Sequence, residues 1–214
     1  MDPLRDYVTW HQDYADPSSG LSWRLQVVRG YLAAALEARP GPVRLLSLCS
    51  GDGRDVLGVL AGRPDAARVR AVLVELHPVI ADDGRMAAQA AGLAEQVEVR
   101  TADAARPAGY ADAYPADVVL LVGIFGNISI EDLWRTIDSA AALCRPGAAG
   151  LWSRGRQFDH RNGEVRARFT ARGFTELAYD EHPDDDRGPA LGLLRYDGPP
   201  RQLDAEATLF TFVR

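Results

Sequence analysis

From residue 43 onward, short apolar runs alternate with longer stretches whose apolar positions recur at helical spacing. The apolar runs predict β-strands over residues 43–49, 69–75, 97–101, 117–122 and 148–153. The stretches between them predict helices over residues 54–62, 78–92, 130–144 and 162–172. A strand followed by a crossover helix pairs in parallel with the next strand. The alternation therefore predicts a doubly wound, mostly parallel sheet with helices on both faces.

The last part of the sequence departs from this alternation. Three strand-like runs, at residues 174–179, 191–196 and 208–213, follow one another without a helix between them. Consecutive strands that lack a crossover helix pair antiparallel. We therefore expect an α/β fold with a Rossmann-like, mostly parallel sheet and an antiparallel C-terminal hairpin at one edge.

Two helices are expected before the first strand, over residues 3–15 and 20–38. Side chains of the first helix that fall at i, i+3, i+4 and i+7 share one face. These are Tyr7, Trp10, His11 and Tyr14. Because sheets of this kind bind ligands at the carboxyl ends of their strands, we expect residues 1–40 to form a helical cap over that edge. Residues 41–214 would form the main body of the same domain.

The basic residues are of a single type: all 24 are Arg, and the sequence contains no Lys. This excludes Schiff-base lysine chemistry and the lysine of a phosphate-binding loop. The net charge of −6 gives no overall attraction to nucleic acid. Cys49 and Cys144 are the only cysteines, too few for a disulfide framework, and no residue pattern predicts a metal site.

The sequence also bears on localisation. Its first ten residues, MDPLRDYVTW, contain no apolar core of a signal peptide. No stretch reaches the roughly 18 uninterrupted apolar residues that a membrane span needs. We therefore expect a soluble cytoplasmic protein, a monomer or homodimer, without a membrane partner.

A glycine-containing turn follows the first predicted strand, at Gly51-Asp52-Gly53. Glycine at such a turn lets the backbone bend sharply and approach a ligand closely. Glu75 ends the second strand, and Asp103 follows the third. Together these positions predict a site for an adenosine-containing cofactor. Val56 stands where a dinucleotide fingerprint has its third glycine, which disfavours NAD.

With these residues in view, the sequence resembles the class I S-adenosylmethionine-dependent methyltransferases over roughly residues 43–180. It is similar to actinobacterial members that share the run S-L-C-x-G-D-G-R-D. The resemblance rests on five segments in the order of that family: Leu45–Gly53, Val72–Glu75, Val99–Asp103, Ala116–Leu121 and Leu143–Gly147.

The resemblance implies a seven-stranded sheet, S-adenosylmethionine as cofactor, S-adenosylhomocysteine as product, and a role for several residues. Glu75 would bind both ribose hydroxyls, while Asp103 and the backbone of Ala104 would meet the adenine. Gly51 and Gly53 would pack under the methionine and ribose. The remaining implied cofactor residues are Ser50, Asp55, Leu76 and Gly123. Ser47 and Cys49 depart from the family, which has an acidic residue and a glycine at these positions.

Methyl transfer needs a positioned acceptor more than a catalytic triad. Tyr7 and Trp10 are predicted to shape the acceptor site, or simply to pack on the sheet. His11 is the predicted general base because its pKa lies near working pH, and Tyr14 shares its face. The other candidates are Phe125 for substrate contact, Asn127 for orienting a polar group or capping a helix, and Arg154 for a carboxylate or for surface solvation.

We therefore expect a methyltransferase that acts on a small-molecule acceptor by in-line transfer. One alternative is an RNA or protein methyltransferase, favoured by the arginines at positions 154, 156, 161, 166, 168 and 172. RNA binding usually needs a basic face or an added domain, and neither is evident. A second alternative, permitted by Ser47 and Cys49, is a non-catalytic S-adenosylmethionine-binding partner subunit.

Overall fold

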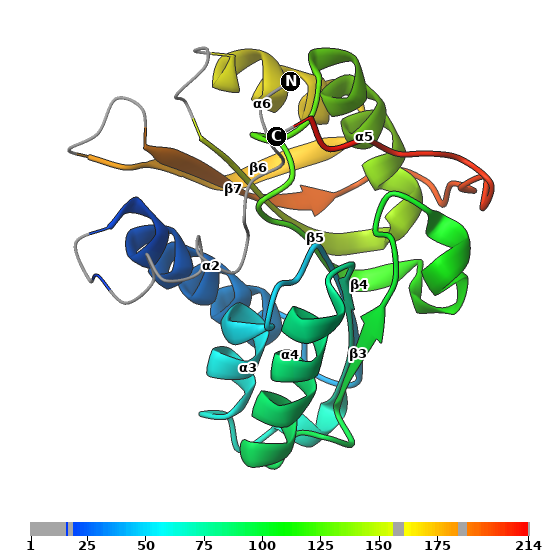
Figure 1. Cartoon of the computed structure of the whole chain (residues 1–214). Coiled ribbons are helices and arrows are strands. Elements are labelled where there is room, and N and C mark those ends of the chain that lie inside the picture. Colours follow the sequence, from blue (N-terminus) through cyan, green and yellow to red (C-terminus); the bar gives the residue numbers. More distant parts are fainter. Residues whose placement is uncertain (1–15, 17–18, 156–160, 184–187, 214) are drawn as a thin grey trace.

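The computed structural model describes residues 16, 19–155, 161–183 and 188–213. Its centre is one seven-stranded sheet in the order β3-β2-β1-β4-β5-β7-β6 (Figure 1). Strand β7 runs antiparallel to both of its neighbours, and the other pairs are parallel. This confirms the predicted fold. The strands are β1 (Val43–Leu48), β2 (Val69–Glu75), β3 (Val97–Thr101), β4 (Ala116–Leu121), β5 (Cys144–Gly155), β6 (Phe174–Glu181) and β7 (Pro189–Tyr196).

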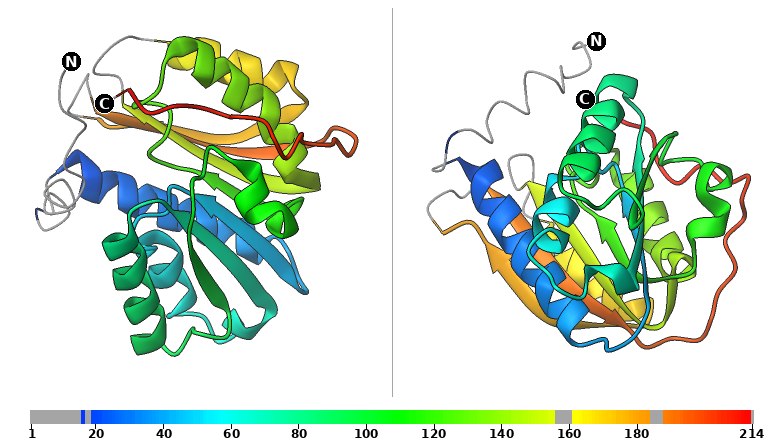
Figure 2. Two further views of the ribbon diagram at one scale, coloured as in Figure 1. Left: turned by 45° about the vertical axis from the view of Figure 1, so that its right-hand side comes forward. Right: turned by 90° about the horizontal axis from the view of Figure 1, so that it is seen from below.

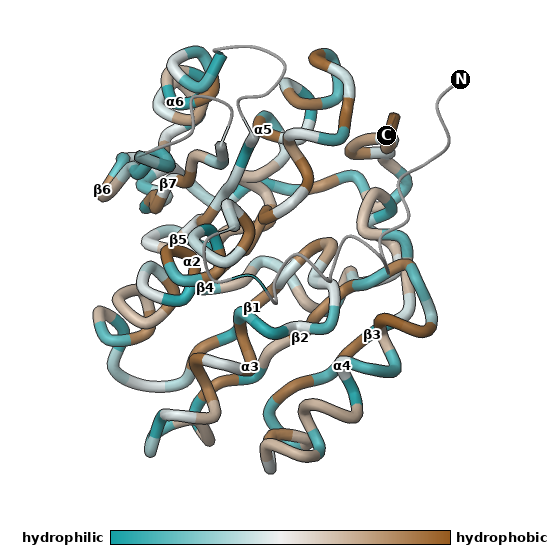
Figure 3. Tube along the Cα trace, turned by 60° about the vertical axis from the view of Figure 1, so that its left-hand side comes forward, coloured by the Kyte–Doolittle hydropathy of each residue, from teal (hydrophilic) through white to brown (hydrophobic). Residues whose placement is uncertain are grey.

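Helices cover both faces of the sheet (Figure 2). On one face lie α2 (Gly20–Glu37), α3 (Arg54–Leu60) and α4 (Pro78–Ala90), with the short η2 (Ala66–Arg68). The other face carries η3 (Pro107–Ala113), α5 (Ile130–Leu143) and α6 (Asn162–Ala171). Each face has its own hydrophobic cluster. Along α4 hydrophobic and hydrophilic positions follow one another (Figure 3), and the buried residues Ile80, Ala81, Gly84 and Ala88 recur at helical spacing on one side.

Local sequence signals fix the ends of these helices. Ser19 and Ser129 are the N-caps of α2 and α5, and each side chain accepts a backbone N–H in the first turn of its helix. Pro78 opens α4, where the missing N–H costs nothing. The observed α2 agrees with the helix predicted over residues 20–38. The cap helix predicted over residues 3–15 lies outside the described residues.

The third C-terminal run, residues 208–213, is not a strand of the sheet. It forms one isolated bridge, between Phe212 and Ile128, and crosses the α5 side of the molecule (red in Figure 1). We call Thr208–Val213 the C-terminal strap. The seven strands of the sheet end at β3 on one edge and β6 on the other, and the strap is not among them.

Hydrogen bonds to three separate elements hold the C-terminal strap in place. The Leu209 N–H donates to the Ala105 carbonyl at 3.0 Å, and the Val213 N–H donates to the Asn127 carbonyl at 2.9 Å. The Thr211 N–H donates to Oδ2 of Asp132, a buried residue on α5, at 2.8 Å. Leu209 and Phe210 are buried in the core. The strap therefore joins the loop after β3 to the loop after β4.

Replacing Asp132 with alanine should detach the middle of the strap. The Thr211 N–H would lose its partner, so we expect Asp132→Ala to lower the free energy of unfolding by about 1–3 kcal/mol. The neighbouring residue Glu131 is exposed and offers a matched control. Glu131→Ala should change the free energy of unfolding by less than about 0.5 kcal/mol. Urea titrations of both variants measure this, and equal losses would contradict the role given to Asp132.

Candidate functional site

A cavity of about 730 Å³ opens at the carboxyl ends of the central strands. A volume of this size suits a cofactor or drug-sized ligand. Most residues predicted to bind a cofactor line it, together with Asn127. They are Ser50, Gly51, Asp55, Glu75, Leu76, Asp103, Ala104 and Gly123. The structure thus brings together residues that lie far apart in the sequence.

The loop between β1 and α3 forms the floor of this cavity. Cys49, Gly51 and Gly53 all adopt left-handed backbone conformations, with φ of 54°, 58° and 71°. A Cβ on Gly53 would lie 2.6 Å from Cδ1 of the buried Leu73, so only glycine fits this position without strain. Cys49 takes the left-handed conformation without being glycine, at a cost of roughly 1–2 kcal/mol. Burial, and then the charges of Glu75 and Asp103, raise the pKa of its thiol well above the ordinary value.

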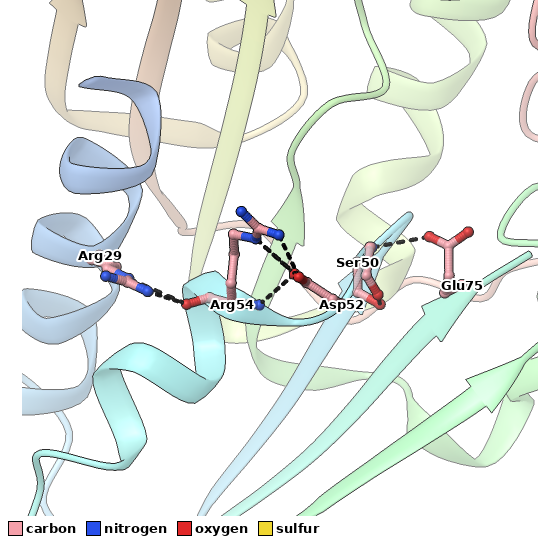
Figure 4. Close-up of polar contacts among 6 residues, drawn as sticks. Arg29, Ser50, Asp52, Arg54 and Glu75 are labelled. Atoms are coloured by element: carbon pink, nitrogen blue, oxygen red, sulfur yellow. Dashed lines mark hydrogen bonds and ion pairs between the residues drawn. The ribbon is translucent and has the colours of Figure 1, made fainter. Parts of the chain in front are cut away.

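The carboxylate of Glu75 is held in position by two backbone groups. Oε2 accepts a hydrogen bond from the Gly51 N–H at 3.0 Å (Figure 4). Oε1 accepts one from the His77 N–H at 2.8 Å. Both partners also line the cavity. A carboxylate oxygen can accept more than one hydrogen bond, so Glu75 keeps acceptor capacity for a pair of hydroxyl groups.

Asp52 and Asp55, two acidic residues of the same loop, lie in different environments. Asp52 pairs with Arg54, whose Nε lies 2.9 Å from Oδ1 (Figure 4). The Arg54 carbonyl in turn accepts hydrogen bonds from the Arg29 guanidinium on α2. Asp55 is buried in the first turn of α3. Burial raises its pKa, although the Val56 N–H and the charge of Arg24 oppose this shift.

Arg24 reaches the same end of the cavity from α2. A Cβ on Gly123 would lie 3.9 Å from its Nη1, so the guanidinium lies close to the loop that follows β4. The backbone at Gly123 is left-handed, and its N–H donates to Ser153 Oγ at 3.0 Å. Asp55 and Arg24 therefore place opposite charges at one end of the cavity.

Asp103 and Ala104 form the cavity wall after β3. Oδ1 of Asp103 accepts a hydrogen bond from the Ala105 N–H at 2.9 Å and thereby fixes its own turn. The carbonyl of the buried Ala104 accepts a hydrogen bond from the Tyr110 hydroxyl at 2.8 Å. Buried Tyr110 thus supports the loop from behind.

Asn127 does not cap α5, because Ser129 does so. Its Nδ2 instead donates to the Gly123 carbonyl at 2.8 Å, and the residue lines the cavity. The prediction that Asn127 caps this helix is therefore wrong. Asn127 belongs to the lining of the cavity instead.

Phe125 and Arg154, two predicted substrate contacts, lie outside the cavity lining. Phe125 is only 1% exposed and stacks on Trp152 in the core. Arg154 is buried near α6, and its Nη1 donates to Asn162 Oδ1 at 3.5 Å. The alternative prediction, that Arg154 is solvated at the surface, is therefore also wrong. The four predicted residues of the cap helix, Tyr7, Trp10, His11 and Tyr14, lie outside the described residues.

Sequence reasoning missed two parts of the wall. Thr208, Phe210, Thr211 and Phe212 of the C-terminal strap line the cavity. So does Arg24, with its α2 neighbours Leu25 and Val28. The alternation of residues 208–213 indicated a strand, and nothing local to the sequence shows that this segment returns to the ligand edge. Arg24 belongs to a helix whose position only the packing determines.

Comparisons with known proteins match the fold. No protein-family model and no curated protein matches the sequence. Among solved structures, magnesium protoporphyrin IX methyltransferase from Synechocystis PCC 6803, crystallised with SAH, superposes with a TM-score of 0.68 at 12% identity. That match covers 89% of this chain and 94% of the other.

Two Burkholderia thailandensis proteins are also similar. A 1,6-didemethyltoxoflavin-N1-methyltransferase matches with a TM-score of 0.63 at 17% identity, over 90% of this chain and 86% of its own. An O-methyltransferase family protein matches with a TM-score of 0.63 at 18% identity, over 84% of this chain. The chain spans only 57% of the length of that protein. These likenesses establish the fold of class I S-adenosylmethionine-dependent methyltransferases.

Across the described part of the chain, no group of three or more His, Cys, Asp or Glu side chains is placed to hold a metal ion. None of the described helices is long and apolar enough to cross a membrane.

The packing of the floor loop predicts a large effect of one methyl group. Gly53→Ala should lower the free energy of unfolding by about 1–3 kcal/mol, because the left-handed backbone and the contact with Leu73 both oppose a Cβ. Gly163→Ala is the control, since its Cβ meets nothing within 4 Å. Chemical denaturation compares the two variants, and an unchanged Gly53→Ala protein would refute this account of the loop.

Proposed function

We propose that this protein is an S-adenosylmethionine-dependent methyltransferase that acts on a small-molecule acceptor. The observation that carries the proposal is the carboxylate of Glu75, fixed by the Gly51 and His77 N–H groups at the floor of the cavity. A carboxylate held in this way suits the two hydroxyl groups of a ribose. The run Ser47–Asp55 further supports a place among the actinobacterial members of the class.

The remaining cavity residues fit the other parts of this cofactor. Asp103 and the loop around Ala104 would meet the adenine, beside Leu76 and His77. Asp55 and Arg24 would bind the ammonium and carboxylate of the methionine end, because their charges are complementary to that zwitterion. Ser50 and Gly51 would bring backbone close to the ligand, whereas Gly53, also predicted to contact it, is buried outside the cavity lining and faces Leu73. Asp52 is less suited to the ammonium, since Arg54 already neutralises it.

S-adenosylmethionine, when bound, would supply a methyl group on a sulfonium, whose sulfur–carbon bond would break as the bond to the acceptor formed and leave a neutral thioether. The protein's own contribution would be to position the acceptor, because holding it in line with the methyl group can supply much of the rate acceleration. Asn127, which lines the cavity from the loop after β4, would orient the acceptor. An O–H or N–H acceptor must also release a proton, and His11 remains the predicted base.

The distribution of arginines favours a small molecule over RNA. Arg166 pairs with Glu176, while Arg168 and Arg172 both pair with Asp138. Arg161 pairs with Glu164, and Arg154 is buried. Four of the six arginines that could have formed a basic face are thus paired with carboxylates, Arg154 is buried, and Arg156 lies outside the described residues. RNA binding needs free cations for phosphate.

Glu75→Gln tests the proposed cofactor site. The amide keeps the shape but loses the charge-assisted acceptor, so S-adenosylhomocysteine should bind about 10- to 100-fold more weakly by calorimetry. Glu95→Gln, which changes an exposed carboxylate away from the cavity lining, is the matched control and should bind normally. If the unaltered protein binds neither S-adenosylmethionine nor S-adenosylhomocysteine at sub-millimolar concentration, the proposed function is wrong.

Asp55→Asn tests the methionine end separately. S-adenosylhomocysteine should bind about 10-fold more weakly, whereas 5′-methylthioadenosine, which lacks the amino-acid group, should bind within about twofold of the unaltered protein. Burial already penalises the charged form of Asp55, so the neutral amide should not destabilise the fold. Equal weakening of both ligands would remove Asp55 from this subsite.

A further inference from the structure

At one end of the cavity the C-terminal strap runs beside the loop that follows β3. The Leu209 N–H donates to the Ala105 carbonyl at 3.0 Å. The next residue back along the strap is Thr208, and the next residue forward along the loop is Arg106. Arg106 and Thr208 both line the cavity. Two segments that are far apart in the sequence therefore bring a guanidinium and a hydroxyl to the same stretch of the wall.

The backbone at Arg106 is held on both sides. Its N–H donates to the Asp103 carbonyl at 2.9 Å, and its carbonyl accepts a hydrogen bond from the Gly109 N–H at 3.1 Å. The Ala108 N–H donates to the Ala205 carbonyl at 3.1 Å, so the loop and the C-terminal segment run antiparallel here. Arg106 lies between the two hydrogen-bonded positions, and its side chain therefore starts from a fixed point beside the strap.

Arg106 differs from most arginines of this protein because the fold gives it no partner. Among the described residues, the guanidinium groups of Arg106 and Arg201 alone make no hydrogen bond or ion pair. Both residues are exposed, but Arg201 lies outside the cavity lining. The Thr208 hydroxyl likewise has no hydrogen-bond partner in the described part of the chain. A cation and a hydroxyl are thus available to a ligand in the cavity.

The other charged residues of the described lining have partners or roles in the proposed function. Asp52 and Arg54 pair with each other. Those that would contact the cofactor are Arg24, Asp55, Glu75 and Asp103. S-adenosylmethionine has one carboxylate, which Arg24 would bind, and no second anionic group. Arg106 is therefore left for an anion that the acceptor carries.

The surroundings of Arg106 favour a carboxylate over a phosphate. One guanidinium binds a planar carboxylate through two parallel hydrogen bonds, and a threonine hydroxyl can donate a third. A phosphate dianion calls for more positive charge than one arginine supplies. Asp103, which lies three residues before Arg106 and also lines the cavity, opposes a second negative charge.

A carboxylate at Arg106 lies far from the methionine end of the proposed cofactor site. Gly123, beside Arg24, follows β4, whereas Arg106 follows β3. In the sheet, β2 and β1 lie between these two strands. Three strand spacings of about 4.8 Å place the two loops about 14 Å apart. A molecule that reaches from Arg106 to the methyl group is therefore elongated.

We propose that Arg106 and Thr208 form a carboxylate-binding subsite, and that the acceptor is an elongated small molecule whose carboxylate is remote from the methylated atom. The inference rests on the proposed function. The Arg106 guanidinium binds the carboxylate through paired hydrogen bonds, and the Thr208 hydroxyl donates to it. The subsite holds the far end of the acceptor while the near end meets the methyl group.

Three flexible probes test which end group is bound. They are 10-hydroxydecanoate, 10-hydroxydecanamide and 10-hydroxydecyl phosphate, whose chains are chosen to match the separation of the two loops. The protein is saturated with S-adenosylhomocysteine, and binding is measured by ligand-observed NMR titration. We expect the carboxylate to bind at least about fivefold more tightly than the amide or the phosphate, because it alone combines one negative charge with a planar pair of acceptors.

Inter-ligand NOEs test the orientation of 10-hydroxydecanoate in the same samples. Protons of the methylene group next to its hydroxyl should show NOEs to the methylene protons beside the sulfur of S-adenosylhomocysteine. Protons of the methylene group next to its carboxylate should show none. The reverse pattern would place the carboxylate at the methionine end and overturn the subsite.

Substitutions assign the preference to residues. Arg106→Gln removes the charge and should abolish the preference for the carboxylate over the amide. Arg201→Gln is the matched control, since it changes the other unpaired arginine outside the lining, and it should keep the preference in full. Thr208→Val should weaken 10-hydroxydecanoate about threefold through the loss of one neutral donor. All three variants should bind S-adenosylhomocysteine within about threefold of the unaltered protein, which also shows that they fold.

The outcomes separate this inference from the one on which it rests. An unaltered protein that takes up no S-adenosylhomocysteine overturns the proposed function, and the subsite with it. A protein that takes it up but binds the three probes alike, prefers the phosphate, or binds none of them overturns the subsite alone. So does a preference for the carboxylate that survives Arg106→Gln, or a large loss of S-adenosylhomocysteine binding in that variant.

Discussion

Parallel pairing of β1 with β2 on one side and β4 on the other determines where everything else in the site lies. Leu45 is in register with Ala71 of β2 and with Val118 of β4. The three strands therefore end at the same level, and their following loops meet at one edge. The turn at Cys49–Gly53, the carboxylate of Glu75 and the loop at Gly123 depend on this register for their contacts. A shift of one residue would turn every side chain of β1 to the opposite face.

The C-terminal strap adds a constraint that the sheet does not supply. The sheet anchors each loop at the ligand edge only through the two ends of that loop. The middle of such a loop is usually among the least stable parts of a fold. Here the strap links the loop after β3, through Ala105, with the loop after β4, through Asn127. Asp132 fixes its centre from α5. A long wall segment is thereby kept in place by backbone hydrogen bonds rather than by side-chain packing alone.

Sequence reasoning predicted the sheet well because buried parallel strands are continuous apolar runs and the crossovers between them have a fixed hand. It found Glu75, Asp103 and the glycine turn because strand ends in such a sheet share one edge. It placed Phe125 at the ligand because that residue follows Gly123. The surrounding rings of Trp152 and Phe169 draw the side chain into the core instead. The strap and Arg24 escaped prediction because their positions depend on tertiary contacts.

The absence of lysine has a physical consequence in the folded chain. A guanidinium binds a carboxylate through two parallel hydrogen bonds, which a lysine ammonium cannot do. Asp138 uses this geometry twice, accepting from Arg168 and Arg172 and thereby joining α5 to α6. Burial opposes the ionisation of Asp138, but these hydrogen bonds outweigh it and lower its pKa to about 2. Cations committed to such pairs hold elements together and offer little to a phosphate backbone.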